Sequence, residues 1–233
     1  MRITVFEEWE ERANGLEEQL KDFDLEIIRL YKDETLPKAS KIDALVLTGS
    51  PESIIEIDRI QYLKKQIPLI KELVEQKKPI LGICLGYQLL AYSLGATIKK
   101  SSKPEIGWYE VSLNSDGLQN KLFKDMPRKF SMFQYHFDEV SKVSDKFKIL
   151  AYSEKTSIQA YQVIDRKAWG VQFHPEVNVV KSKQILSARK EVLDQFNINA
   201  KEMIRQGYEV SPINANKLFA NFYNLVRNDT SYR

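Results

Sequence analysis

Cysteine and histidine are scarce in this chain of 233 residues, which contains one cysteine, Cys84, and two histidines, His136 and His174. A single cysteine permits no internal disulfide, and this favours a reducing compartment. No apolar run approaches the length of a membrane-spanning helix, and the N-terminus turns acidic after a short apolar stretch, unlike a secretory signal. We therefore expect a cytoplasmic protein that does not bind a membrane.

Excess charge and glycine-rich nucleotide motifs are also lacking. The net charge is only +3, which is too weak to indicate a nucleic-acid partner. No Gly-x-x-x-x-Gly-Lys-Ser/Thr phosphate loop occurs, and no synthetase module is fused to the chain. A hydrophobic content of 43% is typical of a globular fold. We expect no cofactor and no metal site.

Strand-like runs alternate with helical patterns along much of the chain. Apolar residues recur at helical spacing over residues 60–74. Strand-like runs occupy residues 2–6, 25–30, 44–47, 79–83, 108–113, 148–152, 158–164 and 168–173. This alternation predicts an α/β fold with an open, largely parallel sheet and helices on both faces, as in flavodoxin-like proteins. Loops that follow the strands of such a sheet gather at one edge, where ligands bind.

Cys84 lies in one of these loops, in the sequence Gly82-Ile83-Cys84-Leu85-Gly86. A strand, a Gly-x-nucleophile-x-Gly turn and a helix form a nucleophile elbow. The glycines permit the unusual backbone angles of such a turn, and the N-terminus of the following helix favours the thiolate. A lone cysteine is more often a small buried apolar residue. Because packing requires neither the glycines nor the turn, we interpret Cys84 as a nucleophile.

His174 and Glu176 follow the last predicted strand. The sequence there is Gly170-Val171-Gln172-Phe173-His174-Pro175-Glu176. Residues i and i+2 of an extended segment project to the same side, so Glu176 can accept a proton from one imidazole nitrogen while the other faces a thiol. An isolated His-x-Glu is more often a surface pair. Together with the elbow, it predicts a nucleophile, a base and an orienting carboxylate.

These two motifs resemble the hallmark motifs of the class I glutamine amidotransferases. Leu47-Thr48-Gly49-Ser50-Pro51 is similar to the family's loop near the oxyanion hole, and Glu105-Ile106-Gly107-Trp108 is similar to a segment of the branch related to the GMP synthetase glutaminase domain. The resemblance is firm over residues 44–176 and looser over the first 43 residues.

The resemblance implies a role for each matching residue. Cys84 would attack the side-chain amide of glutamine to form a γ-glutamyl thioester, with His174 as base and Glu176 orienting it. The backbone N–H groups of Gly49 and Leu85 would form the oxyanion hole. Substrate-binding residues would be Gln88, Gln134, Tyr135 and His136. Relatives often have glycine in place of Ser50 and Phe137.

The segment after Glu176 is longer than a minimal glutaminase domain requires. Apolar residues predict amphipathic helices over residues 185–196, 199–205 and 216–226. We expect residues 1–180 to form the amidotransferase domain and residues 181–233 to form a helical extension packed on it. A partner or self-association surface is the alternative role for these helices.

Three functions remain open at this point. The chain is either a cysteine-dependent hydrolase of glutamine or of another γ-glutamyl compound, or a glutaminase subunit that delivers ammonia to a separate synthetase such as a GMP synthetase-like partner. The third possibility is a glutamine-binding protein without turnover, against which the complete set of Cys84, His174 and Glu176 argues. The sequence does not identify the acceptor, the pathway or the oligomeric state.

Overall fold

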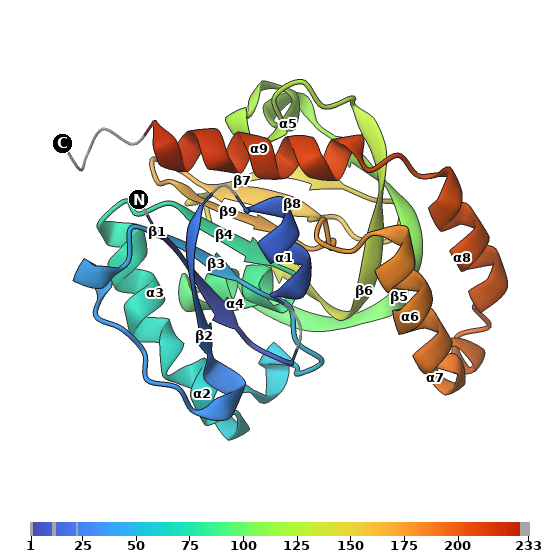
Figure 1. The fold of residues 1–233 in the computed structure, drawn as a ribbon, viewed down its shortest axis with the longest axis horizontal. Coiled ribbons are helices and arrows are strands. Elements are labelled where there is room, and N and C mark those ends of the chain that lie inside the picture. The colour runs from blue at the N-terminus through green and yellow to red at the C-terminus, as the bar shows by residue number, and fades with distance from the viewer. Residues whose placement is uncertain (1, 11–12, 22, 229–233) are drawn as a thin grey trace.

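A single mixed sheet forms the centre of the protein (Figure 1). The computed structural model describes residues 2–10, 13–21 and 23–228. In these ranges the sheet has nine strands in the order β2-β1-β3-β4-β9-β8-β7-β5-β6. The strands are β1 (Arg2–Glu7), β2 (Asp24–Arg29), β3 (Ala44–Leu47), β4 (Ile80–Ile83), β5 (Thr97–Leu113), β6 (Lys129–Lys142), β7 (Phe147–Tyr152), β8 (Ala160–Val163) and β9 (Ala168–Val171).

The direction of the strands changes across the sheet. Strands β2, β1, β3, β4 and β9 are parallel to one another, whereas β8, β7, β5 and β6 continue the sheet with antiparallel pairing. The predicted open α/β sheet is confirmed, with its parallel pairing confined to these five strands. The predicted strands omitted β6, which pairs with β5 from Thr97↔Lys142 to Ser112↔Lys129.

Helices cover both faces of the sheet. They are α1 (Asn14–Gln19), α2 (Gln61–Lys64), α3 (Gln66–Glu75), α4 (Leu85–Ser93), α5 (Ser115–Gln119), α6 (Val179–Ala188), α7 (Lys190–Gln195), α8 (Ala200–Glu209) and α9 (Ile213–Arg227). Alternate residues of β3 serve the two faces: Val46 packs with α1 and α9, whereas Leu45 and Leu47 pack with α3 and α4. No helix in the described ranges is long and apolar enough to cross a membrane.

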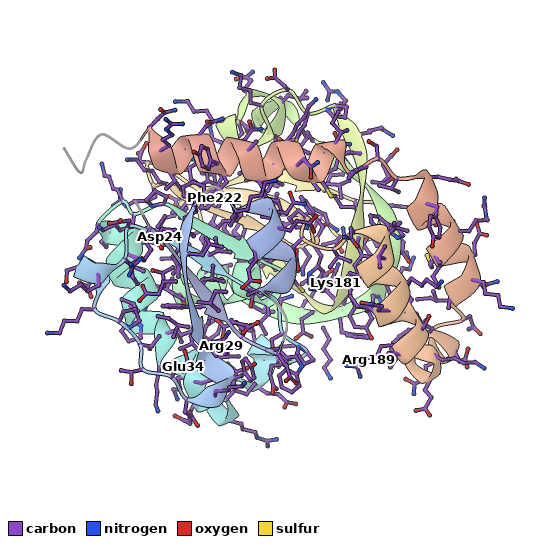
Figure 2. The ribbon with its side chains drawn as sticks, viewed as in Figure 1. Asp24, Arg29, Glu34, Lys181, Arg189 and Phe222 are labelled. Carbon is purple, nitrogen blue, oxygen red and sulfur yellow. The ribbon has the colours of Figure 1, made fainter. Side chains whose placement is uncertain are left out.

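The helices after β9 pack in two different ways. Helix α9 crosses one face of the sheet, and Phe222 points from it into the main core (Figures 1 and 2). Helices α6, α7 and α8 instead cover the β5–β6 pair, where Leu186 and Leu193 join Ile106 and Phe133 in a separate apolar cluster. The single helix predicted over residues 185–196 is divided at Arg189, whose φ of −121° and ψ of 31° are not helical.

Candidate active site

Three loops that sequence analysis selected meet at one edge of the parallel sheet. Gly49 follows β3, Cys84 follows β4 and His174 follows β9. Strand β4 is hydrogen-bonded to β3 on one side and to β9 on the other. Because the carboxyl ends of parallel strands lie at the same edge, neighbouring strands bring these three residues together.

The backbone at Cys84 has the strained geometry of a nucleophile elbow. Its φ is 51° and its ψ is −108°, which L-residues rarely adopt, and helix α4 begins at the next residue. The turn is also tightly packed, because a Cβ atom on Gly86 would lie 2.3 Å from the carbonyl oxygen of Leu47. Cys84 is 4% exposed. The predicted strand–turn–helix arrangement is therefore present around the sulfur.

His174 and Glu176 form a buried pair beside Cys84. The imidazole Nδ1 donates to Oε1 of Glu176 at 2.7 Å, which leaves Nε2 for its hydrogen bond with Cys84. Burial alone disfavours the imidazolium, but the negative charges of Cys84 and Glu176 outweigh burial and raise the pKa of His174 to about 10. The imidazolium in turn holds the pKa of Glu176 below its ordinary value despite burial. The arrangement favours an imidazolium at His174 beside the sulfur of Cys84.

Two backbone amides next to Cys84 have no hydrogen-bond acceptor among the described residues. They are the N–H groups of Gly49 and Leu85, and Leu85 opens helix α4. A Cβ atom on Gly49 would lie 2.9 Å from Cε1 of His174, so only glycine fits this position. Free amide donors beside a nucleophile can stabilise an oxyanion, as the sequence motif predicts.

A chain of side-chain amides also reaches the sulfur. Gln88 donates to the backbone oxygen of Asp138 at 2.9 Å and to Oε1 of Gln172 at 3.1 Å, and Nε2 of Gln172 lies 3.7 Å from Sγ of Cys84. Gln88 therefore orients Gln172 in addition to lining the cavity. Sequence analysis did not select Gln172, although its position two residues before His174 in an extended segment was the available signal.

The predicted substrate-binding residues of β6 do not all face the cavity. Tyr135 and His136 line it, and the backbone oxygen of Tyr135 lies 3.8 Å from Sγ of Cys84. Gln134 is fully buried, donates to Gln159 at 3.0 Å and is not among the cavity-lining residues. Alternation along the strand places Gln134 on the side opposite to Tyr135, where its amide donates to Gln159, which in turn donates to Glu105.

His136 belongs to a closed polar network. Its Nε2 lies 3.0 Å from Oε2 of Glu105 and its Nδ1 lies 3.1 Å from the backbone oxygen of Asp138. Glu105 also accepts hydrogen bonds from Ser153 at 2.7 Å, Thr156 at 2.9 Å and Gln159 at 2.7 Å. Despite burial, the charge of His136 and the hydroxyl donors lower the pKa of Glu105. Both ring nitrogens of His136 are thus engaged with fixed acceptors.

A third buried carboxylate supports the loop that carries Gly49. The backbone N–H of Glu8 donates to Oγ1 of Thr48 at 3.0 Å, and its carboxylate accepts from Nε2 of Gln66 at 2.9 Å. Oε1 of Glu8 and Oε1 of Gln66 have no partner among the described residues. Burial raises the pKa of Glu8 to about 8. A proton on Glu8 would satisfy both oxygens at neutral pH.

Cys84 and His174 open into a cavity of about 560 Å³. One side of the cavity is formed by the ends of the parallel strands and by β6, and the opposite side by α6 and the first residues of α7. Sequence analysis did not predict this second wall. Among the described residues, no group of three or more His, Cys, Asp or Glu side chains is placed to hold a metal ion.

Residues 13–191 match the protein family described as glutamine amidotransferase class-I. The chain belongs to the class I glutamine amidotransferase family. It is 33% identical over 159 residues to one subunit of the glutamine-hydrolysing GMP synthase of Sulfolobus acidocaldarius, a match that covers 68% of this chain and 80% of the relative.

Two further similar proteins differ in how much of their length this chain covers. It is 36% identical over 140 residues to the glutamine-hydrolysing GMP synthase of Borreliella burgdorferi, which covers 60% of this chain but only 25% of that protein. The crystal structure of a glutamine amidotransferase from Thermotoga maritima superposes with a TM-score of 0.84 at 27% identity, covering 97% of this chain and 98% of the other. The class I fold thus extends over the C-terminal helices as well.

Proposed function

We propose that this amidotransferase hydrolyses the side-chain amide of glutamine, or a γ-glutamyl amide bond, through a thioester on Cys84. The observation that supports this most is the buried series from Cys84 through His174 to Glu176, with a distance of 2.7 Å between the last two. Family membership supports the same reaction type. Gly49 and Leu85 serve as the oxyanion hole, and Gln88, Tyr135 and His136 bound the substrate pocket.

In this proposal the Cys84 thiolate attacks the γ-carbonyl carbon, and the amides of Gly49 and Leu85 stabilise the resulting oxyanion. The His174 imidazolium donates its Nε2 proton to the leaving nitrogen as the carbon–nitrogen bond breaks. Neutral His174 then takes a proton from water, which attacks the thioester and releases glutamate. Glu176 keeps the Nδ1 proton in place through both steps.

We also propose that residues 1–180 form the catalytic domain and that residues 181–233 are an extension that completes it. Two observations support this division: α6 and α7 line the cavity, and α9 contributes Leu218, Phe219 and Phe222 to the main core. An extension so closely integrated favours a chain that is catalytically active by itself.

Ammonia delivery to a separate synthetase is the second candidate function. The supporting observation is the identity to one subunit of a GMP synthase and to one part of a longer GMP synthase. Under this alternative, the isolated chain would be slow with glutamine until a synthetase subunit binds.

The test is to measure glutamate and ammonia release by the purified chain, with glutamine and with γ-glutamyl dipeptides. Cys84→Ala should abolish release while the circular dichroism spectrum stays that of the parent, and a diazoketone analogue of glutamine should label the peptide that contains Cys84. Ser93→Ala, in the same helix, is the matched control. Turnover within tenfold of the parent in Cys84→Ala would refute the assignment, and glutamine binding without turnover in the parent would indicate a binding protein.

A further inference from the structure

The cavity beside Cys84 is larger than glutamine requires. Its volume is about 560 Å³. Pockets of roughly 300–1,000 Å³ hold ligands of drug size, whereas glutamine has only about ten non-hydrogen atoms. Part of the cavity therefore remains for a group attached to the γ-glutamyl unit.

The composition of the wall formed by α6 and α7 indicates what that group is. Its members are apolar, amide-bearing or cationic, with no carboxylate among them: Lys181, Gln184, Ile185, Ala188, Arg189 and Val192. Figure 2 labels Lys181 and Arg189, which lie near the two ends of α6. Arg189 is exposed and forms no ion pair with any residue in the described ranges. The wall is suited to an apolar group that carries a negative charge.

Aromatic side chains lie in and beside the cavity. Phe137 is 37% exposed although it lines the cavity, and its ring lies 5.8 Å from that of Tyr135 and 5.7 Å from that of Phe196. Phe196 directly follows α7 and is 41% exposed. Exposed rings beside a nucleophile provide a surface for an aromatic or aliphatic ligand.

The carboxylates that line the cavity come from segments other than α6 and α7. Glu10 follows β1, Glu52 follows β3, and Asp138, which accepts a hydrogen bond from Ser53, lies in β6. Lys100, in β5, is the remaining cation of the lining. The acids of the loops and of β6 suit the α-ammonium group of a γ-glutamyl unit, and Lys181 and Arg189 suit an anion at the other end of the substrate.

From this distribution we propose that the substrate is a γ-glutamyl amide of a large amine that has an apolar body and a carboxylate, and that Arg189 in the α6–α7 wall binds this carboxylate. The proposal rests on the proposed hydrolysis. The amide carbon–nitrogen bond breaks, the amine leaves with the proton from His174, and water supplies the new oxygen of glutamate. A γ-glutamyl dipeptide with an aromatic second residue has these features.

Two chromogenic substrates test the carboxylate directly: γ-glutamyl para-nitroanilide and its meta-carboxy derivative, with glutamine as reference. For the parent, we expect kcat/KM to be at least about tenfold higher for the carboxylated anilide than for the plain anilide, since one charge-assisted contact contributes on that order. Arg189→Gln should remove this preference and leave the rates with the plain anilide and glutamine within about twofold.

Arg205→Gln is the matched control, because Arg205 lies on α8 and pairs with Glu202 and Glu209. An equal loss for all three substrates in Arg189→Gln would overturn the proposal, because Arg189 would then act on the shared γ-glutamyl unit. Hydrolysis of glutamine with both anilides inert would also overturn it while leaving the proposed function intact.

Calorimetry provides a measurement that does not depend on turnover. Cys84→Ala protein should bind γ-glutamyl-phenylalanine at least about tenfold more tightly than glutamine, and adding Arg189→Gln should remove that difference. If no substrate is turned over but this preference is found, the proposed hydrolysis fails and the subsite stands. If glutamine binds as tightly as the dipeptide, the subsite proposal fails.

Discussion

Both histidines of the chain are buried beside a carboxylate, yet their surroundings differ. His136 has acceptors at both ring nitrogens, and Glu105 is surrounded by hydroxyl and amide donors. His174 uses one nitrogen for Glu176 and keeps the other for Cys84, while Oε2 of Glu176 has no partner among the described residues. The first pair is a closed hydrogen-bond network, and the second has one open position that faces a thiol.

The difference shows that a histidine–carboxylate distance alone does not identify a catalytic base. The two distances are 3.0 Å and 2.7 Å, and both histidines are 3% exposed. What separates them is the second ring nitrogen. A proton can be transferred from His174 without breaking a structural contact, whereas both nitrogens of His136 hold contacts of the network that joins β5, β6 and the segment before β8.

The largest expected effect distinguishes the two histidines by activity. His174→Asn should lower kcat about 10³-fold or more, because it removes the group that transfers protons in both half-reactions of the proposed mechanism. His136→Asn should retain kcat within about tenfold and mainly change KM and thermal stability. Steady-state kinetics of both variants on the same substrate measures this, and equal losses would show that the comparison is wrong.

Next in size is a stability difference between the two carboxylates. Glu105→Ala leaves His136, Ser153, Thr156 and Gln159 without their acceptor, so the free energy of unfolding at pH 7 should fall by about 3 kcal/mol. Because the folded-state pKa of Glu105 is lowered, this contribution is present above its ordinary value of 4.5 and is lost as the pH falls through the folded-state pKa.

Glu176→Ala, the matched variant, should cost less stability but more activity, because Glu176 has a single side-chain partner and that partner is the proposed base, His174. Urea unfolding and kinetics on both variants measure the two effects. If Glu176→Ala lowers the free energy of unfolding more than Glu105→Ala does, the description of His136–Glu105 as the closed pair and His174–Glu176 as the open pair is wrong.

A third buried carboxylate, that of Glu8, is paired with an amide instead of a histidine and extends the comparison of the two histidine–carboxylate pairs. The pKa of Glu8 is raised from 4.5 to about 8, so its contribution to stability is full below pH 4.5 and is lost as the pH rises through 8. Glu8→Gln keeps an amide pair with Gln66 at every pH. At pH 9 it should exceed the parent in free energy of unfolding by about 2 kcal/mol. A constant difference from pH 5 to pH 9 would contradict a titrating Glu8.

The smallest expected effect is a shift of the pH–rate profile. With the pKa of His174 near 10, the imidazolium that protonates the leaving group is lost as the pH rises through that value. Glu176→Gln removes one of the negative charges that raise this pKa, so the alkaline limb of kcat/KM should move down by about one pH unit. Glu105→Gln should leave the limb in place, and an equal shift in both variants would contradict separate roles.

Sequence reasoning found the parts of the site that depend on short motifs. Gly82, Cys84 and Gly86 specify a turn by their own backbone requirements, and spacing by two residues places Glu176 beside His174. The central parallel strands β3, β4 and β9 were recognisable because they are buried on both faces and read as continuous apolar runs. These features are local, so one sequence suffices to predict them.

Contacts between distant segments were not predictable in this way. Gln134 is buried against Gln159 and does not line the cavity, a placement that depends on the register of β6 with β5 and on a contact with the segment before β8. The break at Arg189 and the packing of α6 against β5 and β6 likewise depend on tertiary contacts. The same applies to Glu8 and Gln66, which are far apart in sequence and meet only in the folded protein.

The position of β9 links the chemistry to the order in which the chain is made. Strand β9 lies between β4 and β8, and its partners in β4 precede it by a long stretch of sequence (Ile80↔Ala168). Such long-range pairings form late during folding. A growing chain therefore contains Cys84 well before β9, and His174 after it, have been made. Cys84 gains His174 as a neighbour only when β9 takes its place between β4 and β8, so incomplete chains contain the thiol without this partner.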